Sequence, residues 1–244
     1  MWNRAELKLR ARQVLSNNYW KAFLIGLVIL FATGGNQGGS TSGGRSNINN
    51  NIQGWNFPDF SPQYIAMGIV FILSLVFAVI AAFTALRIFL GYPLEVGGRR
   101  YFIKSAQYTD NKGCFTFAFN GGNYKGILIT MLLKGVFNFL WYLLFIIPGI
   151  VKSYSYSMVP YILADNPNIG ATRAIELSMN MTNGHKAAMF VLDLSFIGWY
   201  LLGVLALGVG TLFVLPYDYA TKAELYLVLK ENAYINGFWV EGEL

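Results

Sequence analysis

The feature that most constrains this chain is a run of forty residues, Gly126–Asp165, that is apolar at most of its positions. The hydrocarbon core of a bilayer is about 30 Å thick, and a helix needs about 20 residues to cross it. The run therefore matches two crossings, and Pro148-Gly149 predicts the turn between them. Because backbone polar groups find no water in hydrocarbon, both crossings should be helices, at 126–147 and 149–164.

The composition favours a membrane protein over a soluble one. Of the 244 residues, 55% are hydrophobic and only 12% are charged, whereas a soluble domain carries about 25% charged residues. Further apolar runs predict four more spans, at 17–33, 64–86, 187–207 and 208–229. We therefore expect an all-α polytopic integral membrane protein, with about six transmembrane helices in a single membrane domain over residues 1–244.

The distribution of basic residues predicts the topology. If both termini are cytoplasmic, 15 of the 18 Lys and Arg residues fall on the cytoplasmic side. Such an excess is typical of cytoplasmic loops in membrane proteins. The net charge of +6 then finds its partner in anionic lipids at the cytoplasmic face, and no motif supports nucleic-acid binding.

Two segments outside the predicted spans have a distinct character. Residues 3–16 predict an amphipathic helix in which Arg4, Lys8 and Arg12 recur every four residues as a basic stripe. This stripe is either a contact for anionic lipid on the inner leaflet or only a topology signal. Residues 34–62 begin with a stretch rich in Gly, Asn and Ser, which predicts a flexible external loop.

The longest predicted cytoplasmic connection follows the second span. Residues 91–125 are rich in Lys and Arg, and within them Cys114–Phe119 alternates aromatic and small residues. This alternation predicts a segment lying in the membrane interface, with a half-inserted hairpin as the alternative. By contrast, the span at 149–164 carries Ser and Tyr residues that a lipid-facing helix would avoid, so we expect it at the centre of the protein.

Polar side chains within the predicted spans are the candidate functional residues. A charge at the bilayer centre costs at least ~2.5 kcal/mol unless it faces protein or water. At a rise of about 1.5 Å per residue, four charges on three spans lie at one depth. This predicts a buried layer in which Lys134 pairs with Asp193 or Glu224. The layer is either an ion or proton path, the wall of a substrate cavity, or a structural layer that fixes helix packing. Its members are Lys134, Asn138, Asp193, Asp218, Lys222 and Glu224.

Several phrases of the sequence resemble one family. They are NRAELKLRARQVLSNNYWKAF, IPGIVKSYSYSMVPYILADNP, AIELSMNMTNGHK, LDLSFIGWYLL and PYDYATKAELY. They look like the bacterial integral membrane family named only as domain of unknown function 975. The second half is also similar to the membrane domain of some glycerophosphodiester phosphodiesterases. The resemblance implies a multi-pass protein of the bacterial plasma membrane, and it carries over no catalytic residue.

The residue types exclude most catalytic chemistry. The chain has a single cysteine, Cys114, and a single histidine, His185. These leave no intrachain disulfide, no multi-cysteine metal site and none of the usual His-based metal and triad chemistry, and no nucleotide-binding or hydrolase motif is present. We therefore expect no cofactor and no catalytic residue. The expected function is a non-enzymatic scaffold, partner subunit or lipid-interacting factor that can have a membrane-protein partner. A small transporter or channel is the alternative, and an intramembrane lipid enzyme ranks last.

Overall fold

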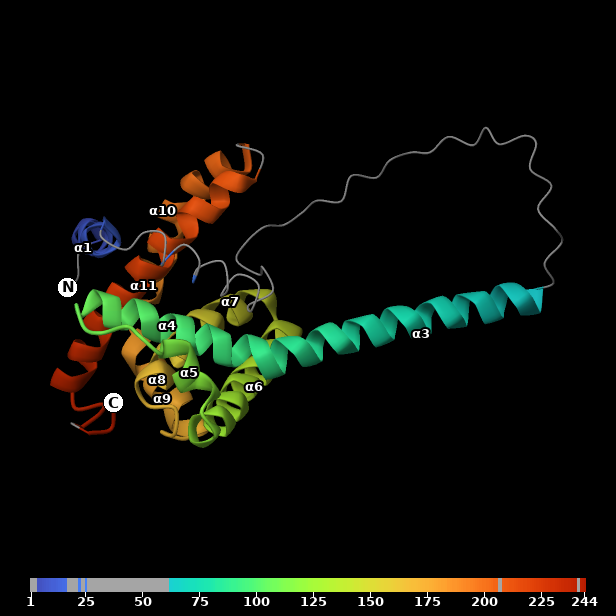
Figure 1. Cartoon of the computed structure of the whole chain (residues 1–244), viewed down its shortest axis with the longest axis horizontal. Coiled ribbons are helices and arrows are strands. Elements are labelled where there is room, and N and C mark those ends of the chain that lie inside the picture. The colour runs from blue at the N-terminus through green and yellow to red at the C-terminus, as the bar shows by residue number, and fades with distance from the viewer. Residues whose placement is uncertain (1–3, 17–21, 23–24, 26–61, 206–207, 241) are drawn as a thin grey trace.

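The computed structural model describes residues 4–16, 22, 25, 62–205, 208–240 and 242–244. Every regular element in these ranges is a helix, which confirms the all-α class (Figure 1). The predicted first span at 17–33 lies almost wholly outside the described residues. The predicted external loop at 34–62 lies outside them except for its last residue.

The second predicted span is part of a much longer helix. Three helical segments follow one another without a loop: α3 (Pro62–Leu86), the π-helical turn η1 (Arg87–Gly91) and α4 (Tyr92–Ala106). Pro93 has no N–H group and therefore cannot bond the carbonyl of Phe89, one turn earlier. That carbonyl instead accepts a hydrogen bond of 2.9 Å from the Tyr124 hydroxyl. The widened turn lets the helix continue, so the loop expected to start at Arg87 does not form.

The segment predicted to lie in the membrane interface packs on α4. It forms the short helix α5 (Cys114–Phe119), in which Cys114 and Ala118 are buried. A Cβ atom at Gly97 of α4 would lie only 3.0 Å from the carbonyl oxygen of Cys114. The glycine therefore permits the close approach of the two helices.

The central apolar run folds as a hairpin and then a turn. Helix α6 (Gly121–Leu144) ends at Phe145, which has extended backbone angles, and α7 (Ile146–Ser155) begins directly after it. The chain thus reverses three residues before Pro148, which falls in the first turn of α7, where proline is tolerated. A Cβ atom at Gly149 would lie 2.5 Å from the Tyr142 ring, so Gly149 permits the close packing of this hairpin.

Residues 149–164 do not form one continuous helix. Helix α7 ends at Ser155, and the buried helix α8 (Val159–Asp165) follows a short turn. Pro160 explains the break, because it has no N–H group to bond the Tyr156 carbonyl, and a proline is tolerated in the first turn of the helix that follows. All residues from Val159 to Ala164 are buried, whereas Ser153, Tyr154 and Ser157, on which the expected central position rested, are only half-buried.

Four further helices complete the described part of the chain. They are α9 (Ala171–Thr182), α10 (Lys186–Leu205), α11 (Val209–Ile235) and the N-terminal α1 (Arg4–Ser16). Helices α10 and α11 form a tight hairpin, in which a Cβ atom at Gly203 would lie 2.6 Å from the backbone nitrogen of Thr211. Helix α1 packs on α11, and its apolar side chains Leu7 and Ala11 are buried there.

Three helices in the described ranges are long and apolar enough to cross a membrane. They are Ile69–Ala106, Gly121–Leu144 and Lys186–Leu205. The first belongs to the α3–α4 helix, which reaches away from the other helices at its α3 end (Figure 1). Side chains in the middle of α3, from Ile69 to Leu86, are all exposed. An apolar helix in this state needs lipid or another protein around it.

Candidate functional site: a buried charge network

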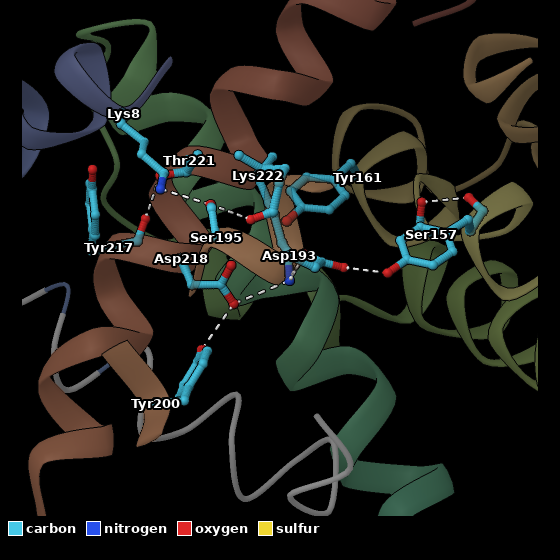
Figure 2. A network of polar contacts seen from close by, with 12 residues as sticks. Lys8, Ser157, Tyr161, Asp193, Ser195, Tyr200, Tyr217, Asp218, Thr221 and Lys222 are labelled. Carbon is cyan, nitrogen blue, oxygen red and sulfur yellow. Dashed lines mark hydrogen bonds and ion pairs between the residues drawn. The ribbon is translucent and has the colours of Figure 1, made fainter. Parts of the chain in front are cut away.

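The centre of the site is a lysine between two aspartates. The Lys222 Nζ lies 3.1 Å from Asp218 Oδ2 and 3.3 Å from Asp193 Oδ1 (Figure 2). Asp218 and Lys222 lie four residues apart on α11 and therefore on one face of that helix, whereas Asp193 comes from α10. The Lys222 side chain is 20% exposed and that of Asp218 only 2%. Two carboxylates thus share one ammonium group, and the three side chains carry a net charge of −1.

Two tyrosines extend this arrangement at both ends. The Tyr154 hydroxyl of α7 donates to Asp193 Oδ2 at 2.9 Å, and the Tyr200 hydroxyl of α10 donates to Asp218 Oδ2 at 3.1 Å. We call these five side chains the charge network: Tyr154, Asp193, Tyr200, Asp218 and Lys222. The network joins α7, α10 and α11. The second oxygen of Asp218 is buried and has no hydrogen-bond partner among the described residues.

The N-terminal helix also reaches this region. Lys8 of α1 donates from Nζ to the Ser195 hydroxyl of α10 at 2.8 Å (Figure 2). Its ammonium group also lies 4.5 Å from the centroid of the Phe196 ring, within the range of a cation–π contact. Lys8 therefore points into the protein, whereas the sequence offered it either as a contact for anionic lipid or as a topology signal. Arg4 of that stripe is exposed, and the side chain of Arg12 lies outside the described residues.

A second polar cluster surrounds Arg99 of α4, which is only 5% exposed. Its Nη1 donates to the Tyr161 hydroxyl at 3.1 Å, and its Nη2 lies 3.7 Å from Glu95. The guanidinium carbon lies 4.5 Å from the centroid of the Tyr219 ring. Because Tyr219 directly follows Asp218, the two clusters are neighbours on α11. The Arg99 Nε and the Tyr219 hydroxyl are buried without partners among the described residues.

Sequence reasoning missed Arg99 because it assigned residues 91–125 to a cytoplasmic connection. Two signals in the sequence favour a helix there. Pro93 suits the first turn of a helix, and Glu95 and Arg99 are spaced four residues apart, as an ion pair along a helix requires. The apolar Tyr101, Phe102 and Ile103 then complete the buried side.

The predicted layer assembles only in part. Asp193, Asp218 and Lys222 come together, but Lys134 does not join them and forms no ion pair or hydrogen bond with any described residue. The expected pairing of Lys134 with Asp193 is wrong, because α6 packs mainly against α4, α7 and α9 while α10 packs against α11 and α7. The Oδ1 of Asn138, on α6, is buried without a described partner.

Glu224 lies apart from the network for a simple geometric reason. It follows Lys222 by two residues, which is about 200° around a helix with 3.6 residues per turn. The two side chains therefore point to opposite sides of α11. Glu224 lines a hollow beside α1 together with Arg10 and Tyr108, so its predicted pairing with Lys134 is also wrong.

The described residues offer little for metal or nucleophilic chemistry. Within the described ranges, no three His, Cys, Asp or Glu side chains come together as metal ligands. Cys114 is buried, and this burial raises the pKa of its thiol. A thiol with a raised pKa is a poor nucleophile at neutral pH, because the thiolate is the reactive form.

Comparison with known proteins adds a family but no activity. Residues 145–233 match the family described as "Protein of unknown function (DUF975)". The matched part runs through α7 to α11 and contains all five side chains of the charge network. No curated protein matches the chain, and no solved structure does. The match supports the resemblance to this family of unknown function, whereas the similarity to phosphodiesterase membrane domains is not shown.

Proposed function

We propose that this protein is a multi-pass integral membrane protein that acts without catalysis, as a scaffold or partner subunit in a bacterial plasma membrane. Its contact with another membrane protein would be made by α3. The observation that carries this proposal is the exposure of the apolar side chains of α3, a helix that reaches away from the other helices (Figure 1).

A topology with six spans and both termini in the cytoplasm is part of this proposal. The α7–α8 pair supplies the fourth crossing, because its non-helical turn is surrounded by protein and therefore tolerated at membrane depth. Helix α11 supplies the sixth: its polar side chains Asp218, Thr221 and Glu224 are buried and so are kept from lipid. The predicted first span at 17–33 completes the count.

One face of α3 is suited to contact another helix. Ser74, Ala78 and Ala82 are spaced four residues apart and form a line of small side chains. Small residues permit close approach of helices in a bilayer, where packing and not the hydrophobic effect drives association. The opposite face carries the larger Val76, Ile80 and Phe83, which suit contact with lipid chains.

Photo-crosslinking in native membranes tests this function. A photoreactive phenylalanine analogue replaces Ala78 on the small face or, as the matched control, Ile80 on the opposite face. The proposal predicts a covalent adduct with a protein, either a second copy or a different chain, from position 78 and much less from position 80. Equal protein adducts from both positions, or lipid adducts alone from both, would contradict it.

A small transporter or channel is the second candidate, and the charge network supports it specifically. Two aspartates lie within 3.3 Å of the one Lys222 ammonium group, and one oxygen of Asp218 has no hydrogen-bond partner among the described residues. Purified protein in liposomes with an internal pH dye tests this candidate. Proton entry that is lost in Asp218→Asn but kept in a variant of exposed Asp110, Asp110→Asn, would favour transport over the scaffold.

A further inference from the structure

Lys134 lies at the middle of a helix that is long and apolar enough to cross a membrane. Helix α6 has 24 residues and is one of the three candidate spans. At a rise of about 1.5 Å per residue, Lys134 lies within about 3 Å of the midpoint of this helix. Both surfaces of a bilayer core about 30 Å thick are then farther away than a lysine side chain extends. The ammonium group of Lys134 therefore stays at apolar depth.

The charged neighbours of Lys134 include more cations than anions. Lys134 forms no hydrogen bond or ion pair with any residue that the structure describes. The charged side chains that act on it most strongly are Glu95, Arg99 and Arg87. The Glu95 carboxylate lies 3.7 Å from Arg99 Nη2, and Arg87 is exposed. One carboxylate thus stands among three cations, and a further carboxylate would stabilise this group.

An additional anion at this depth has to come from another protein chain. Lipid phosphates lie beyond the hydrocarbon core, about 15 Å from its middle, and so they do not reach Lys134. The carboxylates of Asp193 and Asp218 lie on α10 and α11 and already contact Lys222. Charged side chains inside a membrane usually pair with one another. A carboxylate on a neighbouring transmembrane helix is the group that fits.

Lys134 also continues the surface that we assign to the partner. Helix α3 passes without a loop into η1, and η1 packs on α6. Figure 1 shows α6 beside the place where α3 leaves the other helices. Lys134 is half-buried, and Arg87, the first residue of η1, acts on it. A second helix that packs along α3 and η1 can therefore reach Lys134.

We propose that Lys134 forms an ion pair with an aspartate or glutamate in a transmembrane helix of a different protein. This inference rests on the proposed scaffold role and names the chemistry of the partner. Helix α3 contains no acidic residue, so a second copy that packs α3 against α3 brings no carboxylate to Lys134. The partner is therefore a chain of another sequence, and its acid lies about halfway along an apolar helix.

Zero-length crosslinking in native membranes tests this ion pair. Dicyclohexylcarbodiimide, which enters the bilayer, activates a carboxylate, and the Lys134 amine then displaces dicyclohexylurea to form an amide. We expect an adduct in which mass spectrometry finds Lys134 joined to an Asp or Glu of a second protein. That acid should lie within an apolar run of about 20 residues. An amide between Lys134 and Glu95, an acid outside such a run, or no amide at Lys134 would overturn the proposal.

Three variants complete the experiment, with the mass of the complex measured by native mass spectrometry. Lys134→Arg should keep the complex, because the charge remains, but lose the amide, because the amine is gone. Lys134→Gln should lose the complex, whereas the isolated chain should keep its denaturation midpoint, since no described residue pairs with Lys134. Lys125→Gln, which changes an exposed lysine of the same helix, should keep the complex.

The outcomes separate this ion pair from the scaffold role itself. A complex that survives Lys134→Gln would overturn the ion pair and leave the scaffold role intact. A lowered denaturation midpoint of the isolated Lys134→Gln chain would also overturn it, because Lys134 would then serve the fold of its own chain. A single-chain mass for the wild-type protein would contradict the scaffold role, and the ion pair with it.

Discussion

Replacing Lys222 by methionine should destabilise the protein more than any other single change in the charge network. Methionine keeps much of the lysine's apolar length but removes the ammonium group that lies 3.1 Å from Asp218 and 3.3 Å from Asp193. Removing one member of a buried ion pair costs about 3–5 kcal/mol, because the other charge stays buried without compensation. Asp218 is 2% exposed, so most of the loss arises there. Asp193 is 37% exposed and retains access to water, so we expect a loss of about 3 kcal/mol.

The double variants locate the loss. Adding Asp218→Asn to Lys222→Met removes the uncompensated charge and should restore at least about 1 kcal/mol, the coupling expected of residues in contact. Adding Asp193→Asn should restore less. The free energy of unfolding is measured by detergent-induced denaturation, followed by the fluorescence of the six tryptophans. Lys112→Met, which changes an exposed lysine, is the control. Strict additivity of Lys222→Met and Asp218→Asn would refute the geometry of the network.

Three further changes test other parts of the structure. The effects of Lys134→Met and Asp193→Asn on the free energy of unfolding should be additive within about 0.5 kcal/mol in the same denaturation assay, because these residues do not touch. A larger coupling energy would support the pairing expected from the sequence. Gly149→Ala should destabilise the protein by about 1–3 kcal/mol through overpacking, since the added Cβ would lie 2.5 Å from the Tyr142 ring. An unchanged denaturation midpoint would mean that α6 and α7 pack less closely than this distance indicates. The hydrogen bond from Arg173 lowers the pKa of Glu243. The contribution of this contact to stability is therefore present above the ordinary carboxyl range and is lost as pH falls through the lowered pKa of Glu243. Thermal unfolding of Glu243→Gln should lack this acid-dependent loss, and a pH profile identical to that of the wild-type protein would contradict the contact.

The helical membrane class was predictable because it depends on the length and apolar character of the runs. The length of the apolar run also placed a chain reversal close to Pro148. It missed the exact turn, since proline is tolerated in the first turn of a helix and the reversal occurs at Phe145. The two other errors of element length lie before Pro93, where the helix continues, and before Pro160, where it breaks. In both places, hydrogen bonds and burial that involve distant residues decide whether the helix continues.

Three of the five members of the charge network, Asp193, Asp218 and Lys222, belong to the predicted layer, whereas Tyr154 and Tyr200 do not. Depth along a helix follows from residue number, and so Asp193 and Lys222 were placed at one level. The direction of a side chain around the helix also follows from residue number, and it separates Lys222 from Glu224. Which helices are neighbours does not follow from either quantity. The exclusion of Lys134 and the burial of Arg99 therefore required the packing of α4, α6 and α10.

The mass of the protein in native membranes tests the scaffold proposal most directly. Membranes are dissolved into polymer-bounded nanodiscs without detergent, and the mass of the extracted protein complex is measured by native mass spectrometry. The proposal predicts a complex heavier than one chain. The mass should fall to that of a single chain when Ser74, Ala78 and Ala82 are replaced together by leucine, and it should not fall for the matched replacement of Val76, Ile80 and Phe83. A single-chain mass for the unmodified protein would contradict the proposed role.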